Sequence, residues 1–406
     1  HFYKLENKKV AALFNEWMLG MGALYIKKQL PAVATLFTTH ATSIGRSIAG
    51  NNKALYAYMD GYNGDQMAEE LNMQSKHSIE KQTAHYVDCF TTVSEITNNE
   101  CRELLDKPAD VVLMNGFEDD FVPKGATFTG KRKRARSTML RVANCLLGED
   151  LGDDTLIIGT SGRYEFKNKG IDVFLESLNR LNRDKDLKKK VLAFVNVPSW
   201  VGDPREDLQK RLKSKDKFTE PLQCPFITHW LHNMTHDQVL DMLKYLGMGN
   251  RPEDKVKVIF VPCYQDGHDG ILNKHYYDLI LGEDLSVYPS YYEPWGYTPL
   301  ESVAFRVPTI TTDLAGFGLW VNSLKNQHGI NDGVEVLHRS DYNYSEVADG
   351  IKDTVALFST KTEAEIKEIR KRAGQVAEQA LWKHFIQYYY EAYDIALRNA
   401  MKRQLK

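Results

Sequence analysis

The sequence has no long apolar segment, little cysteine and almost no net charge. No apolar run approaches the roughly 18–20 residues of a membrane-spanning helix, and residues 1–25 lack the layout of a signal peptide. The five cysteines are odd in number and form no Cys-x-x-Cys pair, which argues against a disulfide framework or a cysteine zinc site. With 52 basic and 54 acidic residues, we expect no general attraction to nucleic acid or membranes. These absences favour a cytoplasmic protein.

Length and composition are those of an ordinary globular protein. The 406 residues are 43% hydrophobic and 26% charged, which suits two or three domains that each bury a core. Because the sequence begins at His1 and residues 10–25 have a helical pattern, we expect the chain to enter its fold part-way through, as a fragment or a processed chain would.

Short apolar runs alternate with helical patterns along the chain. The runs lie at residues 34–38, 90–93, 111–114, 156–159, 191–197, 256–261, 285–288 and 309–312. Helical patterns lie between them, near residues 64–71, 78–87, 94–105 and 171–182. This rhythm is typical of βαβ units and predicts an α/β protein with two parallel-sheet domains.

We expect the first domain over residues 1–145 and the second over residues 146–385. The stretch between the runs at 191 and 256 is longer than a usual crossover connection, so we expect a helical insertion at about 199–250. Such insertions often serve oligomer contacts. The helical pattern continues from residue 363, and residues 386–406 are predicted to return to the first domain as a helix.

The densest signal is residues 288–301 (YPSYYEPWGYTPLE), where a predicted strand runs into a helix. Open α/β sheets bind ligands at this end of their strands. Residues 298–301 (TPLE) have the pattern of a capping box with proline at the first helical position, which predicts a helix from Pro299. The amides of Gly296, Tyr297 and Thr298 would then suit a phosphate. A well-capped helix with no ligand explains the same pattern.

Glu293 and Glu301 stand eight residues apart in this segment, so both can face one cleft without touching. The capping box alone could account for Glu301. Glu293 lies in an aromatic, proline- and glycine-containing loop and has no such local explanation.

A glycine loop at residues 159–170 places Arg163, Lys167 and Lys169 at the same rim. An arginine fork and a lysine point charge together suit a diphosphate. Basic loop residues are usually solvated surface, but the neighbouring helix N-terminus makes a phosphate site the better interpretation.

Other polar residues carry weaker signals. His40 and Arg46 follow the run at 34–38, where a lone histidine is more often structural, and Glu16 fits a surface carboxylate equally well. The spacing of the histidines at 229, 232 and 236 would suit a metal on a helix, but a loop is as probable there and no acidic partner is placed. The basic run at 131–136 is best explained as a solvated interdomain face.

Taken together, several segments closely resemble glycogen synthases of the animal and fungal type. They are residues 291–299 (YYEPWGYTP), the Glu-x7-Glu spacing, 162–170 (GRYEFKNKG), 37–42 (FTTHAT) and Asn115-Gly116. The resemblance runs over most of the chain. It implies the GT-B architecture, in which two Rossmann-like domains face a cleft. It also implies transfer of glucose from UDP-glucose to the non-reducing end of an α-1,4-glucan with retention, without a metal or another cofactor.

By this resemblance the catalytic residues are Glu293, Arg163, Lys169 and His40. Arg163 and Lys169 would hold the donor diphosphate together with the amides of residues 296–298. Glu293 would contact the donor glucose.

The remaining site residues follow from the same resemblance. Glu301 would bind the ribose, and Tyr264 and Tyr276 would sandwich the uracil. From the first domain, His40 and Asn115 would reach the sugar, Arg46 would approach the donor phosphates, and Glu16 would lie near the acceptor. Retention would follow the front-face route proposed for the family, in which the departing diphosphate helps to activate the acceptor hydroxyl.

The sequence also departs from the family pattern. The family's glycine-rich N-terminal loop would precede residue 1, and Asn15 stands where the family usually has histidine. Only Arg370, Lys371 and Arg372 remain of the regulatory arginine cluster, so activation by glucose 6-phosphate stays open. The insertion matches the region that assembles family tetramers, and we expect a homo-oligomer.

Two other functions stay open from the residues alone. The first is a related GT-B transferase that uses ADP-glucose or a small sugar acceptor. It stays open because stacking on tyrosines does not by itself distinguish one nucleotide base from another. The second is a non-catalytic glucan-binding protein. A phosphorylase is the weakest alternative, because no lysine context suggests bound pyridoxal phosphate.

Overall fold

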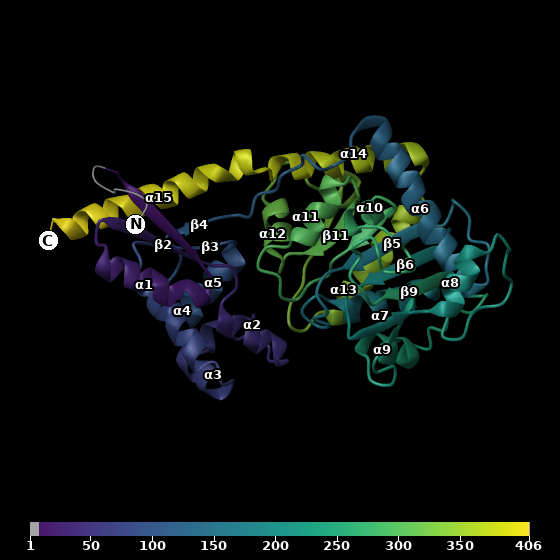
Figure 1. The fold of residues 1–406 in the computed structure, drawn as a ribbon, viewed down its shortest axis with the longest axis horizontal. Helices are drawn as coiled ribbons and strands as arrows, with labels where there is room; N and C mark the ends of the chain where they lie inside the picture. The colour runs from purple at the N-terminus through teal and green to yellow at the C-terminus, as the bar shows by residue number, and fades with distance from the viewer. Residues whose placement is uncertain (1–7, 406) are drawn as a thin grey trace.

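The computed structural model describes residues 8–405, which form two lobes that are each built around a parallel sheet (Figure 1). The first lobe has four strands in the order β1-β2-β3-β4. The second has six strands in the order β12-β11-β10-β5-β6-β9. The prediction of an α/β protein with two parallel-sheet units is confirmed.

The first lobe packs helices on both faces of its sheet. Strand β2 (Val33–Thr39) is buried along its whole length, as expected of a central parallel strand. Its neighbours are β1 (Val10–Asn15), β3 (Cys89–Thr92) and β4 (Val111–Val112). The helices are α1 (Gly20–Gln29), α2 (Ser43–Gly50), α3 (Gly64–Glu70), α4 (Gln74–Tyr86) and α5 (Glu95–Leu104).

The helix predicted over residues 10–25 is wrong. Val10–Asn15 forms strand β1, which pairs with β2 from Val10↔Val33 to Asn15↔Thr38, and helix α1 begins only at Gly20. An apolar run of six residues is too short to show whether it forms a strand or part of a helix. The long-range pairing with β2 decides the outcome.

The second lobe follows the predicted alternation closely. Its strands are β5 (Leu156–Ser161), β6 (Val191–Asn196), β9 (Val256–Val261), β10 (Leu285–Val287), β11 (Thr309–Thr312) and β12 (Val334–Leu337). Its helices are α6 (Gly125–Leu147), α7 (Ile171–Asn182), α10 (Tyr276–Ile280), α11 (Tyr297–Ala304), α12 (Gly316–Asn322), α13 (Tyr344–Ser359) and α14 (Glu363–Gln379). Helix α7 and strands β9 and β11 have the predicted bounds. Helix α6, which a boundary at residue 145 places in the first unit, packs against α8 and α10.

The insertion is helical, as predicted, and also contains a pair of antiparallel strands that the sequence pattern did not indicate. Strand β7 (Val201–Pro204) precedes helix α8 (Glu206–Lys213), and strand β8 (His229–Leu231) lies between α8 and helix α9 (Gln238–Leu246). Strands β7 and β8 pair with each other. His229 is therefore in a strand, where its ring bonds to Thr228 and to the carbonyl of Asp269. The histidine spacing of a helix does not apply there.

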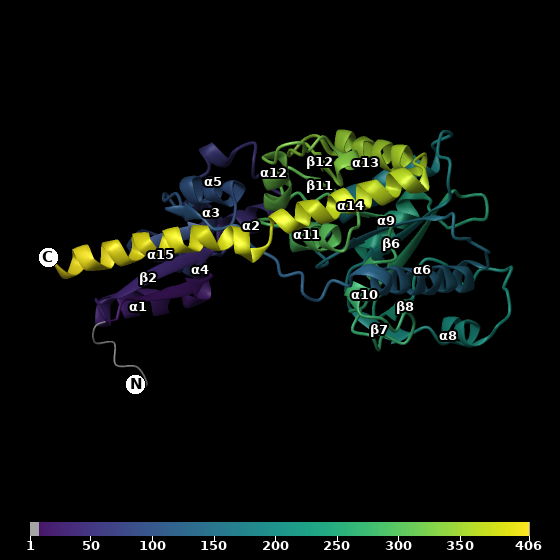
Figure 2. The ribbon, with the colours of Figure 1, turned by 90° about the horizontal axis from the view of Figure 1, so that it is seen from above.

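The C-terminal helices form a nearly continuous rod along both lobes (Figures 1 and 2). Helix α14 packs on α11 of the second lobe, and α15 (Trp382–Gln404) packs on β1 to β4 of the first. Two connections cross side by side between the lobes, because Phe117 N–H donates to Ala380 O at 3.0 Å and Trp382 N–H to Phe117 O at 3.1 Å. We call this crossing the hinge.

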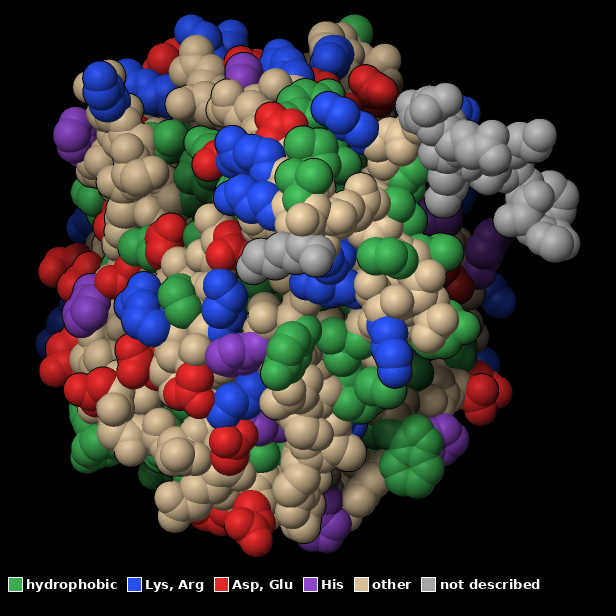
Figure 3. Space-filling view, turned by 90° about the vertical axis from the view of Figure 1, so that its left-hand side faces the viewer, with side chains coloured by type: hydrophobic (Ala, Val, Ile, Leu, Met, Phe, Trp, Pro, Cys, Tyr) green, Lys and Arg blue, Asp and Glu red, His purple; other side chains and the backbone are tan. Residues whose placement is uncertain are grey.

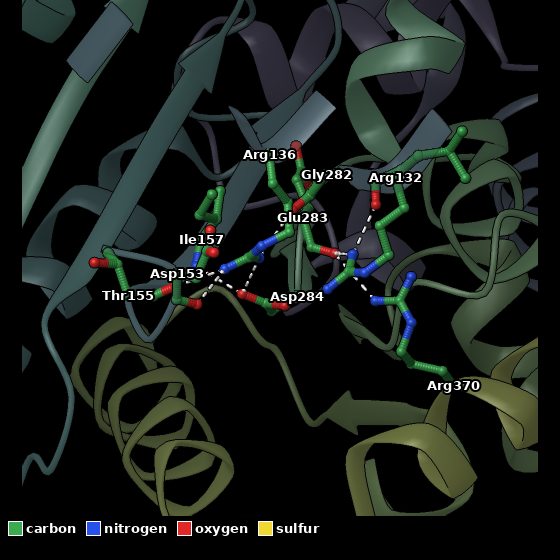
Figure 4. Close-up of polar contacts among 10 residues, drawn as sticks. Arg132, Arg136, Asp153, Thr155, Ile157, Gly282, Glu283, Asp284 and Arg370 are labelled. Atoms are coloured by element: carbon green, nitrogen blue, oxygen red, sulfur yellow. Dashed lines mark hydrogen bonds and ion pairs between the residues drawn. The ribbon is translucent and has the colours of Figure 1, made fainter. Parts of the chain in front are cut away.

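The basic run at 131–136 is solvated only in part, because Lys133 and Arg134 are exposed but Arg132 and Arg136 are not. It lies on α6, where Arg132 and Arg136 contact the two carboxylate oxygens of Asp284 at 2.6 and 2.7 Å (Figure 4). Asp284 also accepts the Ile157 N–H at 2.9 Å, so the cluster fixes β10 beside β5. Arg370 of the expected regulatory cluster is buried and donates to the Glu283 carbonyl.

The charges on the surface are mixed. Basic and acidic side chains are interspersed over the face seen from the first lobe (Figure 3). Among residues 8–405, no helix combines the length and apolar character needed to cross a bilayer.

We predict that Asp284→Asn destabilises the second lobe by about 3–5 kcal/mol, because it leaves two largely buried arginines without their counter-charge. Burial alone would raise the pKa of Asp284, but Arg136 and Arg132 hold it below its ordinary value. The stabilisation is therefore present at neutral pH and lost as the pH falls below the ordinary aspartate pKa. Differential scanning calorimetry of the chain from pH 7 to pH 3 measures it.

Asp150→Asn is the matched control, because Asp150 pairs with Lys217 on the surface and such a pair contributes about 0–1 kcal/mol. Equal losses in the two variants would contradict the assignment of Asp284 as a structural anchor.

Candidate functional site

Two loops meet where the strand order of the second lobe reverses. From β5 the chain proceeds outward through β6 and β9, and β10 then returns to the other side of β5. Such a switch point opens a crevice at the carboxyl ends of the strands. The loop at residues 162–170 follows β5, and the loop at 288–296 follows β10, so both predicted motifs line this crevice.

Backbone contacts hold the two loops together. The Tyr291 and Tyr292 N–H groups donate to the Asn168 carbonyl at 2.9 and 3.0 Å. Gly170 has a φ of +68°, and a Cβ there would collide with the Pro289 carbonyl, so only glycine allows this approach. The loops therefore form one platform.

Lys169 and Glu293 form an ion pair across this platform. Their side chains are only 15% and 12% exposed. The structure thus brings together two residues that the sequence singled out in separate motifs. Charge pairing is required there, because either group alone would be a poorly solvated charge.

Arg163 and Arg46 converge on a carboxylate that the sequence analysis did not select. Arg163 contacts Glu165 at 3.0 Å, and Arg46 of α2 contacts the same oxygen from the first lobe at 3.5 Å. The Arg163 side chain is 62% exposed, so it is free to turn toward a ligand. Arg46 also lies 5.8 Å from the centroid of the Tyr292 ring.

The capping box predicted at residues 298–301 does not form. Helix α11 begins at Tyr297, with Gly296 at φ 109° as its N-cap and no side-chain cap. Glu301 instead accepts a hydrogen bond from the Tyr277 hydroxyl at 2.7 Å, and burial raises its pKa. The first amides of α11, including those of Tyr297 and Thr298, have no acceptor within the helix and face the same crevice end.

The two tyrosines expected around a base lie on different elements. Tyr276 begins α10, and its hydroxyl contacts Ser161 Oγ at 2.9 Å. Tyr264 follows β9 and is 78% exposed. Tyr264 thus lies beyond the carboxyl end of β9, and the Tyr276 hydroxyl contacts the last residue of β5.

The first lobe presents its own polar groups at the carboxyl ends of β1, β2 and β4. Glu16 follows β1 and His40 follows β2, and the Glu16 N–H donates to the Thr38 carbonyl at 2.9 Å. The His40 ring lies 3.0 Å from the side-chain oxygen of Asn15. Burial raises the pKa of Glu16 and lowers that of His40, so the imidazole is neutral near pH 7. Asn115 is buried beyond β4.

Tyrosines from the second lobe hold the lobes together beside Glu293. The Tyr292 hydroxyl donates to Glu100 of α5 at 2.9 Å, and Thr42 donates to the same oxygen at 2.6 Å. The Tyr291 hydroxyl accepts the Leu55 N–H at 3.1 Å and donates to Asp341. Through Tyr291 and Tyr292, the loop that carries Glu293 is therefore in direct contact with the first lobe.

Two buried carboxylates, Glu100 and Glu80, were not predicted from the sequence. Burial raises the pKa of each to about 7. Glu80 accepts from Thr39 and from the Ser43 N–H. The helical spacing of the sequence could have revealed Glu100. It lies on the apolar face of α5, among the buried residues Ile96, Thr97, Cys101 and Leu104.

Comparisons with known proteins agree with this geometry. A family profile described as "Glycogen synthase" matches residues 1–205 and 206–406. Glycogen [starch] synthase of Neurospora crassa is 29% identical over 97% of this chain and 64% of its own length. Isoform 2 of Saccharomyces cerevisiae is 29% identical over 98% of this chain and 65% of its own. The human liver protein is 28% identical over 97% and 63%. The chain thus spans less than two thirds of the length of these relatives.

Solved structures show the same fold at low sequence identity. Sucrose-phosphate synthase from Thermosynechococcus elongatus has a TM-score of 0.53 at 16% identity, covering 95% of this chain and 73% of its own. The catalytic domain of Starch Synthase IV from Arabidopsis thaliana, bound to ADP and acarbose, has a TM-score of 0.56 at 12% identity, covering 96% and 73%. The predicted GT-B fold is confirmed.

We predict that Glu100→Gln flattens the dependence of thermal stability on pH. The folded pKa of about 7 lies above the ordinary 4.5, so this group's contribution is complete below pH 4.5 and is lost as the pH rises through about 7. The melting temperature of the variant should fall less between pH 5 and pH 8, by about 2–4 °C for each kcal/mol removed. Parallel pH profiles of wild type and variant would contradict this assignment.

Proposed function

The chain belongs to the glycogen synthase family, and we propose that it transfers glucose from UDP-glucose to the non-reducing end of an α-1,4-glucan with retention of configuration. The observation that carries this proposal is the meeting of Lys169 and Glu293 at the switch point, beside the amide end of α11. That arrangement offers a cation and helix amides for a diphosphate, with a carboxylate for sugar hydroxyls.

The donor diphosphate would bind where positive charge and unpaired amides meet. Lys169 would exchange its contact with Glu293 for the diphosphate, and the exposed Arg163 would turn toward the same group. The amides of Gly296, Tyr297 and Thr298 would complete the site. Preorganised donors of this kind stabilise the charge that develops on the leaving group.

The sugar would lie between the two lobes. Released from Lys169, Glu293 would accept hydrogen bonds from the donor glucose. The neutral His40 and the buried Asn115 would reach that sugar from the first lobe, and Glu16 would lie on the acceptor side. Arg46 already touches the second lobe through Glu165, which supports a role near the donor phosphates.

Retention is proposed to follow the front-face route. The departing diphosphate would help to activate the incoming glucan hydroxyl on the same face of the sugar, and the protein would supply position and charge stabilisation. Because residues of both lobes must meet on one donor, closure of the lobes would gate turnover.

The proposal extends to the recognition of the nucleotide base and to the oligomeric state. Tyr264 and Tyr276 would stack on uracil, and Glu301, held by Tyr277, would bind the ribose. No metal or further cofactor is proposed. We also propose a homo-oligomer assembled through the insertion at about 199–250 and a cytoplasmic location.

We predict that Arg163→Ala lowers the rate of glucosyl transfer by about 10²–10³, because it removes a charged donor from the leaving group. The measurement is incorporation of labelled glucose from UDP-glucose into glycogen. Lys167→Ala is the matched control in the same loop, since the Lys167 ammonium lies 5.0 Å from the centroid of the Tyr291 ring and not beside Glu293. That variant should lose less than about tenfold.

An unchanged rate of glucosyl transfer in Arg163→Ala would contradict the proposed role of the loop at 162–170. Transfer from ADP-glucose in preference to UDP-glucose would favour the related transferase. Glucan binding without any nucleotide binding would favour a non-catalytic glucan-binding protein.

A further inference from the structure

A histidine, a cysteine and an aspartate from three separate segments of the second lobe meet beside the insertion. His229 lies in β8, Cys263 follows β9, and Asp269 lies in the loop that leads to α10. One ligand atom of each, namely a ring nitrogen, the sulfur and a carboxylate oxygen, lies within 4.8 Å of the other two. Among residues 8–405, no second group of histidine, cysteine and acidic side chains meets in this way. We call this group the His-Cys-Asp cluster.

The Asp269 carboxylate is held in place by backbone amides and keeps room for a further partner. It accepts the N–H groups of residues 271, 272 and 273 at 3.0, 2.8 and 2.7 Å. Two of these amides donate to Oδ1, and only the Asn273 N–H donates to Oδ2. Because each carboxylate oxygen has two lone pairs, Oδ2 can accept one more contact without losing its amide.

The His229 ring is buried, at 1% exposure, and has a polar partner at each nitrogen. Nε2 lies 2.7 Å from the Asp269 carbonyl, and Nδ1 lies 2.9 Å from the Thr228 hydroxyl. If an ion takes the place of the carbonyl at Nε2, the ring proton moves to Nδ1, where the Thr228 oxygen can accept it. A hydrogen-bond acceptor behind the ring is typical of histidines that bind metals.

We propose that the His-Cys-Asp cluster binds a Zn²⁺ ion. Thiolate, imidazole and carboxylate are ligands that zinc prefers, whereas calcium and magnesium prefer oxygen alone. Cys263 and Asp269 are partly exposed, so an ion can enter from solvent and a water molecule can complete a tetrahedral set. The Zn–S bond forms as the Cys263 thiol gives its proton to the solvent, so binding releases one proton for each ion.

The ion would hold the insertion against the loop between β9 and α10. β8 belongs to the insertion, and Gln209 of α8 in the same insertion donates to the Gly270 carbonyl of that loop at 3.1 Å. The role is structural, and the ion takes no part in glucosyl transfer. If the chain has the proposed function, the ion would also steady Tyr264, which adjoins Cys263 and is proposed to stack on uracil. Zinc binding itself does not depend on that function.

Isothermal titration calorimetry of the full chain with zinc chloride at pH 7 tests the proposal. Repeating the titration in buffers with different enthalpies of ionisation counts the protons released. A cysteine thiol is protonated at pH 7, so we expect one ion for each chain and about one proton for each ion. Millimolar Mg²⁺ should not compete. Failure to bind one ion for each chain, or binding without proton release, would overturn the proposal.

Cobalt(II) gives a second measurement that requires no variant. Bound in place of zinc, it should show the near-ultraviolet charge-transfer band of a thiolate ligand, and zinc should remove that band by displacement. A cobalt complex without the band would overturn the role of Cys263.

Two serine variants assign the sulfur ligand. Cys263→Ser keeps the size of the side chain, and it should weaken zinc binding at least about tenfold, the least effect typical of changing even a partner behind a ligand. It should also abolish the proton release. Cys224→Ser is the matched control, because Cys224 is likewise partly exposed but lies outside the cluster, and it should bind zinc as the wild type does.

Wild-type zinc affinity in Cys263→Ser, or an equal loss in both serine variants, would overturn the proposal. Zinc binding without transfer from UDP-glucose would support the cluster and remove the proposed function. Transfer without zinc binding would do the reverse.

Discussion

The ion pair between Lys169 and Glu293 is the contact on which the rest of the site depends. It joins the loop after β5 to the loop after β10 at the point where the strand order reverses. Because both side chains are largely buried, each requires the other, and the pair fixes a cation and a carboxylate at the mouth of the crevice. In the proposed reaction the donor supplies the competing anion, so that the same two groups turn from each other to the diphosphate and the sugar.

The same loop also connects the two lobes. Tyr291 and Tyr292 precede Glu293 directly, and their hydroxyl groups bond to the Leu55 amide and to Glu100 of the first lobe. On the other side of the loop, the Gly316 N–H at the start of α12 donates to the Glu293 carbonyl at 3.0 Å. A change in the angle between the lobes would therefore act on Glu293 through its immediate neighbours, which is the physical basis for coupling closure to chemistry.

Sequence patterns predicted most of the parallel-sheet elements, because a buried run of β-branched residues bounded by turns has few alternatives. Helix α7 and strands β9 and β11 are examples. Patterns failed where a distant partner decides the outcome. Val10–Asn15 becomes a strand only through pairing with β2, Glu301 leaves the capping box for Tyr277, and the basic run on α6 finds Asp284 about 150 residues later. Sequence motifs predicted Lys169 and Glu293 as site residues, but Glu100 and Glu165 were identified only through their contacts in the structure.

Isothermal titration calorimetry of this chain with UDP and with ADP tests the central claim most directly, because the platform of Lys169, Glu293 and α11 lies within the second lobe. The account predicts that UDP binds at least about tenfold more tightly than ADP, a difference of about 1.4 kcal/mol, and that Lys169→Ala weakens UDP binding. Tighter binding of ADP, or no heat with either nucleotide, would contradict it.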